Sequence, residues 1–172
     1  MVGENMHLLW WFLMILAVGA LLVHLNHVIG RRETEKNIIE AQQTVNRAVQ
    51  TILVTKGAQW GLVISDDQTV RSTLVANIWG YNVMAFEFQV PYTERRPPQK
   101  LQEALNQSLQ VYSQEEQLPL LDANQVVAPL VATDIWYDQI KPVVHLEIAN
   151  VVTYQTLAYL HDLKKLNQPF QT

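Results

Sequence analysis

The chain has 172 residues, a formal net charge of −4 and no cysteine. The lack of cysteine excludes disulfides, thiolate catalysis and cysteine-based zinc or iron–sulfur sites. The acidic balance argues against a nucleic-acid-binding surface, and the sequence has no glycine-rich phosphate loop, no Gly-x-Ser-x-Gly and no His-Glu-x-x-His. We therefore expect neither a nucleic-acid partner nor a cofactor.

An apolar run lies close to the start of the chain. Residues 8–23 contain no charged side chain, and the apolar character continues almost to Arg31 and Arg32. As a helix, residues 8–29 would extend over about 33 Å, which matches the hydrocarbon core of a bilayer, about 30 Å thick. Residues 1–30 are therefore predicted to form an N-terminal tail and a single transmembrane helix, with the lipid bilayer as the first partner.

Two other interpretations of this run remain open. A cleaved signal peptide needs a positive leading region and a cleavage site of small residues. Residues 1–7 contain no lysine or arginine, and the small residues within 17–20 are followed by more leucine. We therefore favour a retained anchor over a cleaved signal peptide, and both over a buried helix of a soluble core.

The charges that flank the run bear on its orientation in the cell membrane. Positive residues follow the run and none precedes it; they are Arg31, Arg32, Lys36 and Arg47. This asymmetry favours a cytoplasmic domain. Because long domains translocate largely regardless of charge, the side of the membrane stays uncertain.

Three polar residues lie near the end of the apolar run. His24 and His27 are three residues apart, so they would share one face of a helix, and Asn26 lies between them. Two such imidazoles could ligate a metal or a haem. A position in the membrane interface explains them more simply, and contact with a partner helix is the next interpretation. We expect no metal at this pair.

Residues 31–56 carry apolar side chains at helical spacing, which predicts an amphipathic helix that continues out of the membrane. Ile38, Val45 and Ile52 lie seven residues apart. This stripe covers about two heptads, fewer than the three or four that support a coiled coil. Packing on the chain's own domain is the favoured interpretation, and a homo-oligomer formed through residues 31–56 is the alternative.

Residues 57–172 are predicted to form one small α+β domain. The first elements are a strand at 60–65 and a helix that begins at Asp66 or Asp67 and ends at Gly80. Later segments show alternating or helical apolar spacing. They are a strand at 81–92, a helix at 101–112, a hairpin of strands 126–137 and 142–152, and a closing helix at 153–166. The expected sheet is small, mostly antiparallel and covered by helices on one face.

A second set of polar residues falls on the predicted hairpin. His145 and Glu147 would share one face of the second strand, and Asp134 and Asp138 are candidates to lie across the hairpin from them. General acid–base catalysis or metal binding needs such groups within bonding distance. Because no nucleophile or third ligand accompanies them, an exposed sheet face is the favoured interpretation.

Several large aromatic residues fall at the ends of predicted elements beside apolar residues. Because each can bury a large area, we expect them to contribute to the core rather than to an exposed binding patch. These residues are Trp60, Trp79, Tyr81, Trp136 and Tyr137.

The features predict a non-catalytic, single-pass subunit of a multiprotein membrane or cell-envelope assembly, such as a secretion, conjugation or pilus-type machine. Its role would be that of a scaffold that binds other membrane proteins. The layout loosely resembles that of pilin-like proteins, but without a basic leader, a processing site or an early glutamate in the apolar run. We therefore assign no family.

Two alternatives remain for the function. One is an accessory subunit of a respiratory-type complex that uses His24 and His27. The other is a membrane-tethered enzyme that uses His145, Glu147 and Asp134.

Overall fold

The computed structural model describes residues 2–64, 70–75, 82–122 and 127–166, apart from the side chains of residues 2–9, 13, 23 and 25–34. The chain divides into two compact units, Met1–Asn37 and Ile38–Thr172. The second unit thus begins before residue 57, and it includes most of the predicted amphipathic helix.

Helix α1 covers Val2–Lys56 and contains both the apolar run and the amphipathic segment. Among the residues that the structure describes, no helix has the length and apolar character that crossing a membrane requires. The predicted transmembrane helix is therefore not supported by the described residues and stays a prediction.

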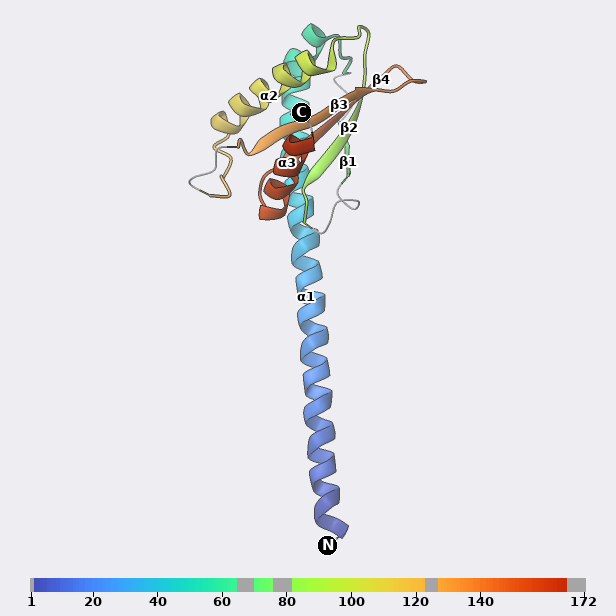
Figure 1. Ribbon diagram of the computed structural model, residues 1–172, viewed down its shortest axis with the longest axis vertical. Helices are drawn as coiled ribbons and strands as arrows, with labels where there is room; N and C mark the ends of the chain where they lie inside the picture. The colour runs from blue at the N-terminus through green and yellow to red at the C-terminus, as the bar shows by residue number, and fades with distance from the viewer. Residues whose placement is uncertain (1, 65–69, 76–81, 123–126, 167–172) are drawn as a thin grey trace, which may run out of the picture. The chain divides into compact units, whose positions relative to one another are not determined.

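The second unit contains a four-stranded antiparallel sheet, which confirms the predicted α+β class (Figure 1). Its strands, in the order β1-β2-β4-β3, are β1 (Ser72–Leu74), β2 (Ala85–Pro91), β4 (Val143–Asn150) and β3 (Leu130–Tyr137). Helix α2 covers Pro98–Glu115 and helix α3 covers Tyr154–Leu166. The predicted strand at 81–92, the hairpin and the two helices are thereby confirmed, each within a few residues.

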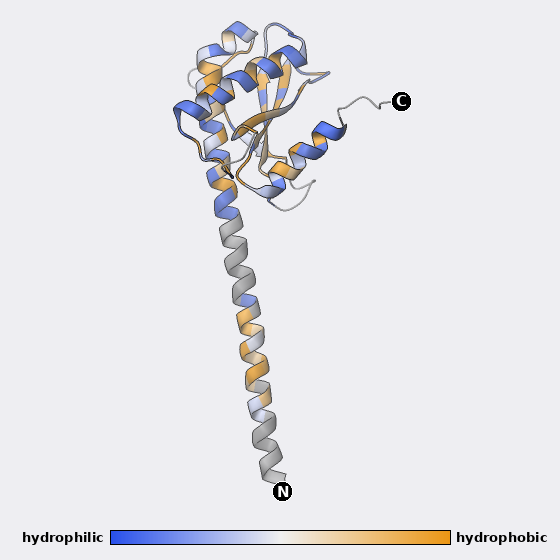
Figure 2. Cartoon of the chain, turned by 60° about the vertical axis from the view of Figure 1, so that its left-hand side comes forward, coloured by the Kyte–Doolittle hydropathy of each residue, from blue (hydrophilic) through white to orange (hydrophobic). Residues whose placement is uncertain are grey.

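The main core lies between one face of the sheet and two helices, α2 and the part of α1 from residue 38 onward. Figure 2 shows apolar residues along the strands of the sheet. From α1, Val45 and Ile52 are buried in this core, and Ile38 packs against it. These three residues therefore pack on the chain's own domain, so an oligomer through residues 31–56 would have to use the outer face of the helix.

Helix α3 covers part of the other face of the sheet. Ala149 of β4 follows the core-facing Ile148 and points to the other face; with Val151, just after the strand, it forms a separate cluster with Leu160 of α3. The hydroxyl of Thr156 on α3 accepts a hydrogen bond from the backbone N–H of Met84, at 2.9 Å. The prediction that helices cover one face was therefore wrong, because the closing helix folds back onto the second face.

The predicted strand at 60–65 was wrong at its start. A short 3-10 helix, η1 (Gly57–Trp60), occupies this position, and Gly61 follows it with φ of 73°. A Cβ atom at Gly61 would lie 2.9 Å from the Cβ of Glu94, so only glycine fits both the backbone angle and the close approach. After this turn, Leu62 forms a single β-bridge with Tyr92.

The predicted helix from Asp66 or Asp67 to Gly80 was also wrong in its centre, where the structure has strand β1. The two aspartates, Ile78 and Gly80 lie outside the described residues. The spacing of Val70 and Leu74 fits a helical face, but Leu74 is paired with Phe86 of β2. Pairing with a distant strand has overridden a weak local pattern.

Amide side chains of α1 cap the β1 edge of the sheet. Gln42, Asn46 and Gln50 lie four residues apart and so share one face of the helix. Gln42 donates to the carbonyl of Ser72 at 2.8 Å, Asn46 accepts from the Ser72 hydroxyl at 2.7 Å, and Gln50 accepts from the N–H of Val70 at 2.8 Å. The bonds made by Gln42 and Gln50 occupy backbone groups that would otherwise be open to another strand.

The β3 edge is capped in the same way by α2. The Asn106 amide forms two hydrogen bonds with the backbone of Ala132, one from the Ala132 N–H at 2.8 Å and one to its carbonyl at 3.2 Å. Gln102 donates to the carbonyl oxygens of Ala132 and Thr133, at 2.9 and 3.0 Å. Both edges of the sheet are therefore protected from strand addition at these positions.

Candidate functional site

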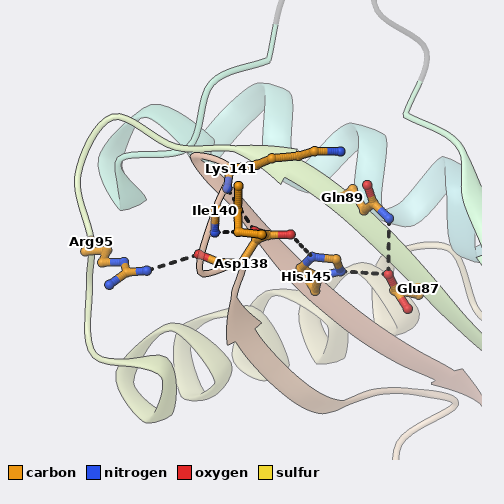
Figure 3. A network of polar contacts seen from close by, with 7 residues as sticks. All are labelled: Glu87, Gln89, Arg95, Asp138, Ile140, Lys141 and His145. Atoms are coloured by element: carbon orange, nitrogen blue, oxygen red, sulfur yellow. Dashed lines mark hydrogen bonds and ion pairs between the residues drawn. The ribbon is translucent and has the colours of Figure 1, made fainter.

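The polar cluster predicted on the hairpin centres on His145, which lies on the second face of the sheet. Its Nδ1 atom is 2.7 Å from Oε1 of Glu87 on the neighbouring strand β2 (Figure 3). The two side chains are 13% and 24% exposed, so this contact is largely shielded from water. Trp136 of β3 stacks on the imidazole, with ring centroids 4.8 Å apart and planes 12° apart. Three adjacent strands thus contribute to one small cluster.

Asp138 joins this cluster to the loop between β3 and β4. One carboxylate oxygen accepts the backbone N–H groups of Ile140 and Lys141, at 2.6 and 2.8 Å, and the other lies 3.7 Å from Nε2 of His145. The hydrogen bond from the backbone N–H of Lys141 has the largest effect on Asp138, followed by that from Ile140. Both lower the pKa of the Asp138 carboxyl below its ordinary value. The carboxylate therefore has a structural role as the acceptor that closes the loop.

Glu147 has different partners. Its Oε1 atom accepts hydrogen bonds from the hydroxyls of Thr133 at 2.6 Å and Tyr159 at 2.7 Å, and the residue is 8% exposed. Burial, followed by the bond to Glu147, raises the pKa of Tyr159. Glu147 thereby fastens α3 to the sheet.

The structure does not bring the predicted trio of His145, Glu147 and Asp134 into hydrogen-bonding contact. Asp134 is exposed, and its carboxylate accepts the backbone N–H of the next residue, Ile135. Within the described residues, no hydrogen bond connects any two members of the trio, because His145 turns to Glu87 and Asp138 instead. The predicted proximity of Asp138 is confirmed, and Glu87 is the partner that sequence reasoning missed.

The other predicted site residues are described only in part. His24 is exposed, while the side chains of Asn26 and His27 lie outside the described set. In the part of the chain that is described, no group of three or more histidine and acidic side chains is arranged to hold a metal ion.

The aromatic residues predicted for the core behave differently from one another. Trp60 is 8% exposed, as predicted, and Tyr137 is half-buried. Trp136 is 36% exposed, so its core placement was wrong: β3 turns it to the second face of the sheet, beside His145. Trp79 and Tyr81 lie outside the described residues.

Among the described residues, two grooves can be placed away from the His145 cluster. The larger has a volume of about 720 Å³ and lies between the C-terminal end of α2 and the segment before β3; Gln110, Gln114, Leu118, Leu120, Val127 and Pro129 are among its lining residues. The smaller, about 310 Å³, lies beside the end of β2 and is lined by Val63, Arg71 and Gln89 among others. Neither groove includes His145 or Glu87.

Comparison of the chain with protein-family models, curated proteins and solved structures finds no match.

The role of Asp138 predicts a pH dependence. Because its pKa is lower in the folded than in the unfolded chain, its stabilising effect is complete above the unfolded value, about 3.9, and is lost as pH falls through the folded value. We expect Asp138→Ala to lower the melting temperature at neutral pH, and the difference from the unchanged chain to shrink below about pH 3.9.

Thermal melts followed by circular dichroism at several pH values check this expectation. Asp138→Asn is the matched control, because it keeps an acceptor oxygen for the loop but does not titrate. A difference between the Ala variant and the unchanged chain that is the same at every pH would contradict the assigned role.

Proposed function

We propose that this chain is a non-catalytic, single-pass membrane-anchored subunit of a multiprotein membrane or cell-envelope assembly, of the secretion, conjugation or pilus type. Residues 8–29 would anchor it in the lipid bilayer, and the unit 38–172 would act as a scaffold that binds other membrane proteins. The flanking positive charges favour the cytoplasmic side for this unit.

The observation that carries the proposal is the apolar surface of the first part of α1. Described side chains on every side of this helix are exposed, from 48% for Val18 to 69% for Trp10. Successive helical positions are rotated by about 100°, so the consecutive residues Trp10, Trp11 and Phe12 already face different directions. A helix that is apolar all round needs an apolar environment, either lipid or a protein core.

The polar clusters support a structural role for the second unit. Asp138 closes a loop, Glu147 holds α3, and His145 bridges Glu87 and Asp138. Each of these three side chains thus connects strands, a loop or a helix of the unit. The capped edges at Ser72 and Ala132 direct recognition toward loops, helices and grooves.

The experiment is affinity purification of the tagged full-length chain from detergent-solubilised membranes. We expect it to be recovered in a complex of defined composition and larger than the monomer. Recovery as a single monodisperse monomer would contradict the proposal. The double variant with His24→Leu and His27→Leu tests the respiratory-type alternative. If the variant is recovered in the same complex with the same cofactor content, that alternative is dismissed.

A further inference from the structure

We infer that copies of this chain associate head to tail, with the loop between β3 and β4 of one copy seated in the groove at the end of α2 of the next. We call the loop residues Ile140 and Lys141, together with the neighbouring Arg95 and Arg96, the hairpin tip. The groove of about 720 Å³ lined by Leu118 and Leu120 is called the α2 groove. Both belong to the unit 38–172, so the inference does not depend on the membrane anchor.

The hairpin tip presents an apolar side chain on a well-ordered loop. Ile140 is 94% exposed, the highest value among the exposed large apolar residues of the described chain. Its own N–H and that of Lys141 are both held by the Asp138 carboxylate. A β-branched residue has no advantage in such a turn, whereas an apolar anchor on a preorganised loop loses little entropy on binding.

Positive charge surrounds this anchor. Arg95 donates to the carbonyl of Asp138 at 3.2 Å, and its guanidinium lies over the rings of Tyr92 and Tyr137, at 5.8 and 5.0 Å from their centroids. Arg95 is thereby held beside the loop and remains exposed. Arg96 and Lys141 are exposed as well, and Arg96 forms an ion pair with Glu94 at 3.6 Å. With Arg95 and Lys141 beside this pair, the rim of the tip carries a net positive charge.

The α2 groove has an apolar part among amide side chains, and its acidic neighbours lie outside its lining. Leu118 and Leu120 supply apolar lining, and the Leu120 side chain is 49% exposed. Glu115 and Glu116 are exposed at the C-terminal end of α2, where the helix dipole adds further negative potential. The groove volume of about 720 Å³ is large enough to hold the Ile140 side chain together with the loop that carries it.

Strand β3 has the segment that follows α2 at one end and the loop to β4 at the other (Figure 1). The groove includes Pro129, immediately before β3, and the hairpin tip follows directly after its last residue, Tyr137. A strand of this length extends over roughly 26 Å, so the tip of one copy is too far away to fill its own groove. Two different surfaces in contact produce a heterologous interface, which extends into a filament or closes into a ring.

The test measures the mass of the full-length chain in a mild non-ionic detergent by analytical ultracentrifugation over a range of concentrations. We expect the mass to rise with concentration and the association to weaken with added salt. Ile140→Asp should damage the tip and Leu120→Asp the groove, each raising the dissociation constant about tenfold or more. Val111→Asp is the matched control, because Val111 is 43% exposed on α2 and does not line the groove.

Mixing the two defective variants gives the decisive result. The Ile140→Asp copy keeps its groove and the Leu120→Asp copy keeps its tip, so the mixture should form a dimer and stop there. A monomeric unchanged chain at all concentrations would overturn the inference. So would association that both variants retain, since it would then run through another surface such as residues 8–29. Circular dichroism confirms that each variant is folded before it is measured.

Discussion

Replacing Leu16 with arginine is expected to move the full-length chain from the membrane fraction into an alkaline carbonate wash. Leu16 lies in the middle of the apolar run, and its side chain is 57% exposed, so the change disturbs little packing within the chain. A charge at the centre of a membrane helix costs about 2.5–3.5 kcal/mol on insertion scales. That cost corresponds to roughly a hundredfold shift in the partition between membrane and water.

The matched control is Ile39→Arg, which makes the same kind of change on the same helix but outside the apolar run. Ile39 is 54% exposed, so its environment within the chain is similar. We expect this variant to stay in the washed membrane pellet, as measured by immunoblot of pellet and supernatant. Equal retention of the two variants, or release of the unchanged chain, would contradict the proposed anchor.

Strong local periodicity explains which elements the sequence predicted correctly. Phe86, Phe88 and Val90 alternate with Glu87 and Gln89, and all three are buried on one face of β2. The proline pair at 97–98 and the apolar spacing after it mark the start and the buried face of α2. In both elements the burial of a continuous apolar face is large enough to decide the structure, and the pattern records it directly.

The elements that the sequence predicted wrongly depend on residues that are distant along the chain. Strand β1 is three residues long, and its outer edge is held by amides of α1 about thirty residues earlier in the chain. Gln42 and Asn46 look like ordinary surface residues in the sequence, because nothing local links them to Ser72. Such a strand exists through its non-local hydrogen bonds, so a local spacing argument could not find it.

The polar cluster shows the same limit. Alternation placed His145 and Glu147 on one face of β4, as the structure has them. It could not show that β2 lies beside β4, because strand order depends on how the whole sheet packs. The pairing of His145 with Glu87 therefore needed the sheet register, whereas the link to Asp138 followed from the hairpin itself.

Phe88→Ala is expected to reduce the free energy of unfolding of the second unit by about 3–5 kcal/mol, through lost burial and the cavity that remains. Phe88 is fully buried and pairs with Ser72 of β1 and Leu146 of β4, so the cavity would open in the centre of the sheet. Because a domain has only about 5–15 kcal/mol of stability, the variant should unfold at much lower denaturant. Denaturant titration of the full-length chain, followed by tryptophan fluorescence, measures the change.

Tyr154→Ala is the matched control, because it removes an aromatic ring that is 65% exposed. It should change the free energy of unfolding by no more than about 0.5 kcal/mol. Similar costs for the two variants would show that this face of the sheet is not the core that holds the fold together.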